Sequence, residues 1–236
     1  VPASDLAIAL VNRMIMGLLG PRALPKLALR EGVPSELRTV VVIPTLLTGQ
    51  AQIAEQIERL EVHYLANSEG DLRFALLSDW TDAPSETMLQ DDTLLAATVE
   101  GIAQLNRRQG PAQDGSARFL LFHRRRGWSK GEQKWMGWER KRGKLHELNR
   151  LLRGATDTSF LPTNGPTLSV PSGVRYVITL DADTQLPRGA ACRLVGALAH
   201  PLNRPRFDLQ VGRIVEGYAV LQPRITPTLP TDREGS

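Results

Sequence analysis

The feature that most constrains the fold of this chain is a set of four short apolar runs, separated by segments of helical character. The runs are TVVVIP (39–44), DLRFALLSD (71–79), RFLLFH (118–123) and VRYVITL (174–180). The segments of helical character are residues 53–65, 91–107, 145–152 and 187–200. Strands that alternate with helices favour a mostly parallel sheet with helices on both faces. We therefore predict an α/β fold with a Rossmann-type sheet.

The last of these runs reads as a strand buried on both faces, and it leads directly into Asp181-Ala182-Asp183. Neighbouring carboxylates repel each other, and a divalent cation would resolve the repulsion. Mg²⁺ and Mn²⁺ prefer oxygen ligands and are often shared between one or two carboxylates and a substrate phosphate. We predict that Asp183 binds the metal and that Asp181 binds the ligand or completes the metal shell. The alternative is a pair of solvated turn residues before Pro187.

Two other strand ends lie where an open α/β sheet binds its ligands, beyond the carboxyl ends of the strands. The first strand is followed by Thr45, and the second ends in Asp79. Two acidic strand ends in one crevice suit a ligand with hydroxyl or ring N–H groups on one side. A metal-bound phosphate would occupy the other side.

Residues 123–144, HRRRGWSKGEQKWMGWERKRGK, combine nine Lys or Arg with two acids and three of the four tryptophans. Interleaved basic and aromatic residues are typical of nucleic-acid binding, but also of sites for phosphate and sugar. The third interpretation is a solvated loop. Lys144 opens the predicted helix that follows, where its ammonium and the helix N–H groups suit a phosphate. His146 and Asn149 share one face of that helix.

The N-terminal residues 1–38 read as a helix and a Pro-rich connector, and residues 39–236 as one ligand-binding domain. Residues 6–19 are apolar but too short to span a bilayer. They predict a helix packed on the domain, or a juxtamembrane helix of a longer membrane protein. The single cysteine excludes a disulfide framework. We expect loops at 111–116 and 160–173, and a further edge strand at 215–222. Because the chain begins at Val1, we expect an excised piece.

Several longer strings resemble one family of enzymes over roughly residues 20–236. RTVVVIPTLLT, LLSDWTDA, GWERKRGKLHELNRLLRG and YVITLDADTQLPRGAA are similar to the glucosyltransferase domain of bacterial cyclic β-1,2-glucan synthases, which has the GT-A fold. The resemblance implies a UDP-glucose donor, a divalent cation (Mg²⁺ or Mn²⁺) and inverting transfer to a glucan acceptor. It also implies a large membrane-embedded synthase whose transferase domain lies at the cytoplasmic face of the bacterial inner membrane.

Carried over by position, the resemblance implies that Thr45 and Asp79 contact the uridine and that Lys144 lies near the uridine or the diphosphate. Asp181 and Asp183 would serve ribose, diphosphate and metal. An inverting transferase also needs a carboxylate base to remove the acceptor proton. The base of related enzymes lies well downstream, before a Gln-x-x-Arg-Trp type motif that this sequence lacks. We therefore expect the base to lie beyond residue 236, and the chain to bind its donor but transfer slowly or not at all.

Two other functions fit parts of the sequence. LDADT also matches the pattern of haloacid dehalogenase-like phosphotransferases, in which Asp181 would be the nucleophile and Asp183 an acid/base. That fold needs a downstream lysine and an acidic pair, and no lysine follows Thr184. A non-enzymatic module would bind RNA or anionic membrane through residues 123–144. It gives the acidic strand ends no role, so we expect no nucleic-acid partner.

Overall fold

The computed structural model of the chain describes residues 3–19, 23–163 and 168–223. The chain divides into two compact units, Ala28–Gly196 on the one hand, and Val1–Leu27 with Ala197–Ser236 on the other. The division expected from the sequence, at residue 38, stays a prediction.

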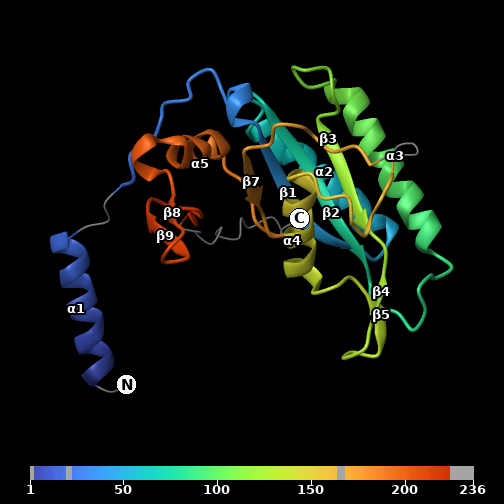
Figure 1. Ribbon diagram of the computed structural model, residues 1–236, viewed down its shortest axis with the longest axis horizontal. Helices are drawn as coiled ribbons and strands as arrows, with labels where there is room; N and C mark the ends of the chain where they lie inside the picture. Colours follow the sequence, from blue (N-terminus) through green and yellow to red (C-terminus); the bar gives the residue numbers. More distant parts are fainter. Residues whose placement is uncertain (1–2, 20–22, 164–167, 224–236) are drawn as a thin grey trace, which may run out of the picture. The chain divides into compact units, whose positions relative to one another are not determined.

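The larger unit is built on a five-stranded sheet with the order β6-β3-β2-β1-β7 (Figure 1). The strands are β1 (Thr39–Leu47), β2 (Leu72–Trp80), β3 (Phe119–Arg124), β6 (Phe160–Leu161) and β7 (Tyr176–Thr179). Four of them are parallel, whereas β6 runs antiparallel to β3. This sheet confirms the predicted α/β fold.

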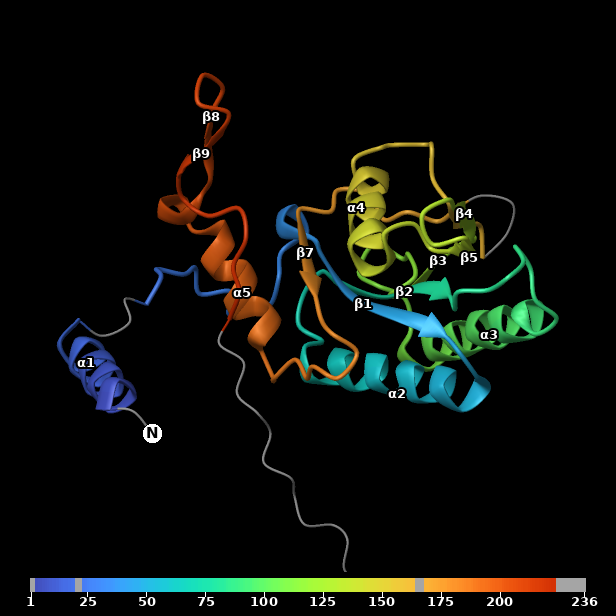
Figure 2. The same cartoon turned by 90° about the horizontal axis from the view of Figure 1, so that it is seen from below.

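Helices cover both faces of this sheet, as the sequence predicts. They are α2 (Gln50–Ala66), α3 (Asp91–Gln109), α4 (Arg140–Leu152) and α5 (Ala190–Ala199). α2 and α3 lie on one face and α4 lies on the other (Figure 2). The first turns of α5 join the α2 side, because Ala191 and Val195 belong to the same core as Leu60 of α2.

Alternation along each strand explains why the apolar runs are continuous. Adjacent side chains on a strand point to opposite faces, and both faces are covered here. The core toward α2 and α3 includes Val41, Ile43, Phe74, Leu76, Phe119 and Leu121. The core toward α4 includes Val40, Val42, Ala75, Leu77, Leu120 and Phe122.

The strand order reverses between β1 and β7. From β1 the chain moves outward through β2 to β3, and it later returns to place β7 on the other side of β1. Ligands of open α/β sheets bind beyond the carboxyl ends of the strands at such a point. Thr45, near the end of β1, and Asp181, just after β7, flank it.

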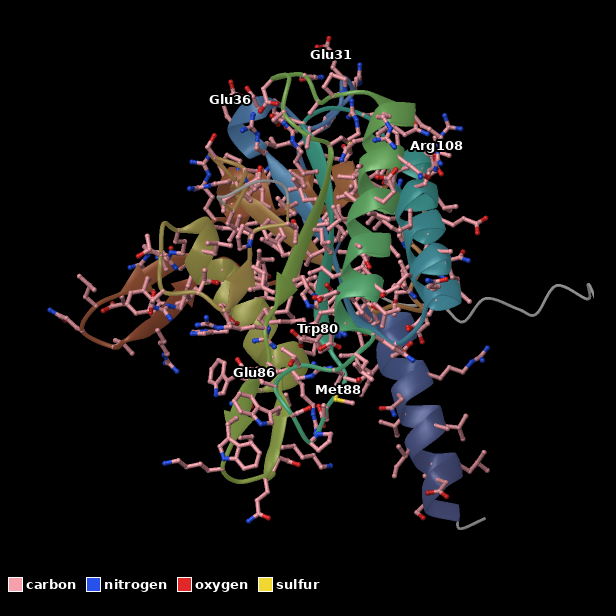
Figure 3. The ribbon with its side chains drawn as sticks, turned by 90° about the vertical axis from the view of Figure 1, so that its right-hand side faces the viewer. Glu31, Glu36, Trp80, Glu86, Met88 and Arg108 are labelled. Carbon is pink, nitrogen blue, oxygen red and sulfur yellow. The ribbon has the colours of Figure 1, made fainter. Side chains whose placement is uncertain are left out.

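A small hairpin stands at the carboxyl end of the sheet, and the sequence analysis missed it. It is formed by β4 (Gly127–Ser129) and β5 (Lys134–Met136). Figure 3 shows Trp80, Glu86 and Met88 at this end of the unit, and Glu31, Glu36 and Arg108 at the opposite end. The backbone of Trp135 exchanges two hydrogen bonds with that of Ala83, which ties the hairpin to the loop after β2.

Three structural expectations are wrong in detail. β7 is partly exposed, not buried on both faces, because it ends the sheet and pairs with β1 alone among the described strands. α4 begins at Arg140, so Lys144 lies in its second turn and not at its start. The predicted edge strand 215–222 is β9 (Arg213–Glu216), which pairs with β8 (Arg206–Asp208) in a separate hairpin of the smaller unit.

The smaller unit also contains the predicted N-terminal helix, α1 (Ala3–Leu19). It exposes several large apolar side chains, namely Leu6, Ile8, Leu10, Val11, Met14 and Ile15. Among the helices that the structure describes, none is both long and apolar enough to cross a bilayer. The loop expected at 160–173 begins with the short strand β6, and residues 164–167 of it lie outside the described residues.

Candidate functional site

Two of the predicted site residues meet on the α4 side of the sheet. Asp79 points to the same face of β2 as Ala75 and Leu77, because side chains alternate along the strand. Asp79 is 2% exposed and Lys144 of α4 is 3% exposed. Their carboxylate and ammonium groups are 3.0 Å apart. The structure therefore brings Asp79 and Lys144 together as a buried ion pair.

Arg124, the last residue of β3, completes this pair from the neighbouring strand. Its Nε and Nη2 donate to the two carboxylate oxygens of Asp79 at 2.7 and 2.9 Å. The other donors reach Glu147 Oε2 at 3.3 Å and the carbonyls of Trp138 and Arg140, both at 3.2 Å. All five N–H groups of the guanidinium are thus satisfied. Burial lowers the pKa of Arg124, but the hydrogen bonds and charges of Asp79 and Glu147 outweigh burial and raise this pKa above its ordinary value.

Lys144 ties β1 to β2 at their carboxyl ends. Besides its ion pair with Asp79, its ammonium donates to the carbonyls of Thr45 at 2.7 Å and Leu77 at 3.4 Å. An ammonium has three N–H donors, so the protein itself uses all of them. Burial lowers the pKa of Lys144 and the charge of Asp79 opposes this shift. A contact between Lys144 and a ligand stays a prediction.

Glu147, one turn along α4, is the fourth member of this buried charge cluster of Asp79, Arg124, Lys144 and Glu147. Its carboxylate accepts hydrogen bonds from the hydroxyls of Thr158 and Ser159, and from the backbone N–H of Ser159. These bonds outweigh burial and lower the pKa of Glu147. The two negative charges of this cluster balance its two positive charges. Charged groups stay ionised in a protein interior when they are paired and hydrogen-bonded in this way.

Thr45 enters the site through its backbone. Its side chain follows the alternation of Ile43 and Leu47 toward the α2 and α3 face, away from Asp79. The carbonyl of Thr45, in contrast, accepts the hydrogen bond from Lys144. The structure thus joins Thr45 to the site by its main chain, and a contact between its hydroxyl and a ligand stays a prediction.

Asp181 and Asp183 are exposed residues of the turn that follows β7. The backbone N–H of Thr184 donates to the Asp181 carbonyl at 3.0 Å, and Arg59 of α2 donates to the carbonyl of Ala182. The side chain of Asp181 contacts the ammonium of Lys141, in the first turn of α4. Asp181 therefore lies beside the helix that carries Lys144.

These two carboxylates offer a limited set of metal ligands. Within residues 3–19, 23–163 and 168–223, no three His, Cys, Asp or Glu side chains gather as a metal-binding group. Mg²⁺ often keeps several waters and is held by one or two carboxylates together with substrate phosphates. By residue type and exposure, Asp181 and Asp183 would suit a cation that is shared with a phosphate ligand, and their binding of a metal stays a prediction. They do not fit a cation enclosed by protein ligands.

Much of the charge of residues 123–144 is paired with acids of the same chain, three of the bases being buried and three exposed. Six of the nine basic residues form ion pairs with acids of the chain: Arg124, Arg126, Arg140, Lys141, Arg142 and Lys144. Two of the tryptophans, Trp128 and Trp138, are 50% and 60% exposed. Trp128 stacks edge to face on Trp135 across the hairpin, with ring centroids 5.8 Å apart. Residues 123–144 therefore form the β4–β5 hairpin and the start of α4, with two exposed indole rings, and not a solvated loop.

His123 is a buried histidine beside the charge cluster, on the opposite face of β3. Its Nδ1 lies 2.8 Å from the hydroxyl of Ser78, and its ring packs edge to face on Trp80 at 4.2 Å. Its Nε2 has no hydrogen-bond partner among the described residues. Burial lowers the pKa of His123 to about 4, so the ring is neutral near pH 7.

The low pKa of His123 predicts a loss of stability in acid. The unfolded histidine titrates near 6.5, so below that pH the unfolded chain binds a proton that the folded chain does not. His123 should therefore lower the free energy of unfolding by about 2 kcal/mol between pH 7.5 and pH 5. Urea denaturation at both pH values, for the wild type and His123→Gln, measures this. Equal pH dependence in the two proteins would contradict the prediction.

Sequence reasoning missed Arg124 and Glu147. Arg124 stands in the basic run Arg124-Arg125-Arg126, where nothing in the residue types distinguishes a buried guanidinium from an exposed one. The available signal was its position, because it follows the strand 118–123 and alternates in phase with Leu120 and Phe122. Glu147 lies within the predicted helix 145–152, but its residue type does not distinguish it from an exposed glutamate, and its partners Thr158 and Ser159 follow the helix.

Comparisons with known proteins connect this chain to one curated relative. A comparison with models of known protein families found no match. Cyclic beta-(1,2)-glucan synthase NdvB of Rhizobium meliloti (strain 1021) is 48% identical over 235 residues. The alignment covers 100% of this chain and 8% of that protein, so the chain spans a small segment of its relative's length. The match confirms the resemblance that the sequence strings indicate.

Proposed function

We propose that this chain, which is related along its whole length to a segment of a cyclic β-(1,2)-glucan synthase, is the sugar-nucleotide-binding part of a glucosyltransferase. The donor is UDP-glucose, and the acceptor is a β-1,2-glucan extended with inversion at the sugar carbon. The identity of 48% over 235 residues is the observation that carries this proposal. The remainder of a large synthase at the cytoplasmic face of a bacterial inner membrane completes the proposed setting.

The geometry at the carboxyl edge of the sheet supports a donor site there. Asp181 and Asp183 would hold Mg²⁺ or Mn²⁺, which neutralises charge on the leaving diphosphate when it is bound. Thr45 and Asp79 would lie next to the uridine. Lys144 already binds the Asp79 carboxylate and the Thr45 carbonyl at the end of β1. It would hold these two groups in place beside the uridine or the diphosphate.

The proposal assigns no catalytic base to the described residues. Two carboxylates downstream of Asp183 are described, Asp208 and Glu216, and both are engaged within their own hairpin. Asp208 accepts hydrogen bonds from two backbone N–H groups of its turn, and Glu216 pairs with Arg206 at 2.7 Å. Asp232 and Glu234 lie outside the described residues.

Metal-dependent binding of UDP tests this function. Calorimetry with UDP and UDP-glucose should give binding in the presence of Mn²⁺ and much weaker binding in EDTA. GDP-mannose should bind less tightly than either. Asp183→Ala should weaken the metal-dependent binding of UDP at least tenfold, or by about 1.4 kcal/mol, because it removes a proposed metal ligand.

The matched control is Asp157→Ala, which removes an exposed carboxylate that pairs with Arg150 on the surface. It should leave the affinity for UDP unchanged. Binding of UDP that is equal with and without metal would contradict the proposal. Trapping of beryllium fluoride on Asp181 without any affinity for UDP would favour the phosphotransferase reading, and salt-sensitive binding of RNA alone would favour the basic module.

A further inference from the structure

Lys141 is a cation beside the proposed metal site that the proposed function has not used. It lies in the first turn of α4, three residues before Lys144, so the two stems leave the same side of the helix. Lys144 is buried against Asp79, whereas Lys141 is half exposed and contacts Asp181. The positive charges of the two lysines repel each other, and this repulsion contributes to the lowered pKa of Lys144.

The contact between Lys141 and Asp181 places the positively charged ammonium of Lys141 against a proposed metal ligand. Within the described structure its ammonium makes one hydrogen bond, to Asp181 Oδ1. The side chains of Lys141 and Asp181 are 50% and 58% exposed, so both can move without opening the core. The Asp181 turn itself is held from the other side by Arg59, through the carbonyl of Ala182. The backbone of the Asp181 turn is thus anchored, whereas the ammonium of Lys141 has no hydrogen-bond partner besides Asp181 among the described residues, so the lysine is the partner that can leave.

We propose that Lys141 is a diphosphate-binding residue that holds Asp181 when no sugar nucleotide is bound and turns to the diphosphate when one is. This inference rests on the proposed function. A lysine stem has four flexible carbons and three rotatable donors, so its ammonium can exchange one anionic partner for another nearby. A divalent cation on Asp181 repels the ammonium, and the diphosphate that arrives with the cation offers it new oxygen acceptors.

This exchange predicts opposite effects of one substitution on two ligands. Lys141→Ala removes the competitor for Asp181, so Mn²⁺ alone should bind roughly two- to fivefold more tightly, the range expected for an exposed ion pair. The same change removes a donor to the diphosphate, so UDP at saturating Mn²⁺ should bind about tenfold more weakly. Titration of MnCl₂ by electron paramagnetic resonance and of UDP by calorimetry measures the two affinities in the full chain.

Arg142→Ala is the matched control for the loss of one positive charge from this turn of α4. Arg142 pairs with Glu139 at 3.0 Å and is 79% exposed. It should leave both affinities near those of the wild type. In an Asp181→Ala background, Lys141→Ala should no longer strengthen the binding of Mn²⁺, because the contested ligand is absent.

The outcomes separate this inference from the proposed function. A wild-type chain that binds both Mn²⁺ and UDP, with affinities that Lys141→Ala leaves unchanged or shifts in the same direction, overturns the role of Lys141 alone. A wild-type chain that binds neither Mn²⁺ nor UDP overturns the proposed function and the role of Lys141 together. Opposite shifts of the affinities for Mn²⁺ and UDP that appear in Lys141→Ala and not in Arg142→Ala support the proposed role of Lys141.

Discussion

Arg124→Met should lower the free energy of unfolding by about 3–5 kcal/mol, the cost of breaking a buried ion pair from one side. The guanidinium is fully buried and satisfies both oxygens of Asp79 and one of Glu147. Methionine fills part of the volume but donates no hydrogen bond. The variant leaves the largely buried Glu147 carboxylate and the carbonyls of Trp138 and Arg140 without this donor. Urea denaturation at pH 7 measures the loss.

Two comparisons separate this loss from a general effect of removing arginine. Arg150→Met breaks an exposed pair with Asp157, so it should change the stability little. Arg124→Met combined with Asp79→Leu should cost less than the sum of the two single changes, since fewer charges are left unpaired. An Arg124→Met variant as stable as Arg150→Met would contradict the idea that the charge cluster holds the strand ends together.

The strands were predictable because their signal is local. A run such as Val40–Ile43 must be apolar at every position when helices cover both faces of the sheet, and this pattern is visible in the sequence. The positions of Asp79 and Asp181 at strand ends were predictable for the same reason, because each lies at the end of an apolar run. Their contact with a ligand stays a prediction. The exposure of β7 was not visible, because it depends on which strand lies at the edge.

The partners of the site residues were not predictable in the same way. The ion pairs of Asp79 with Arg124 and of Asp181 with Lys141 join residues 45 and 40 positions apart. Any of the nine bases in residues 123–144 would have suited either acid by charge. The choice is made by strand alternation, which turns Arg124 toward α4, and by the start of α4 at Arg140. Both depend on the assembled sheet.

Gly143→Ala is the second change with a large expected effect. It should lower the free energy of unfolding, whereas helix propensity alone would raise it. Alanine in place of glycine inside a helix normally stabilises it by roughly 1 kcal/mol. A Cβ at Gly143 would instead lie 1.9 Å from the carbonyl oxygen of Trp138, which accepts a hydrogen bond from Arg124. We expect the variant to lose about 3 kcal/mol, at the upper end of the cost of overpacking a well-packed interior.

The reason for a net loss at Gly143 is that the obstacle is backbone and not the end of a flexible side chain. The first turn of α4 would have to shift, and with it the Trp138 and Arg140 carbonyls that bind Arg124. Gly127→Ala, in the neighbouring hairpin, meets no atom within 4 Å and should be close to neutral. Thermal unfolding of both variants measures the difference. A Gly143→Ala protein more stable than the wild type would mean that helix propensity decides at this position, and that the close approach of the Trp138 turn to α4 does not support the charge cluster.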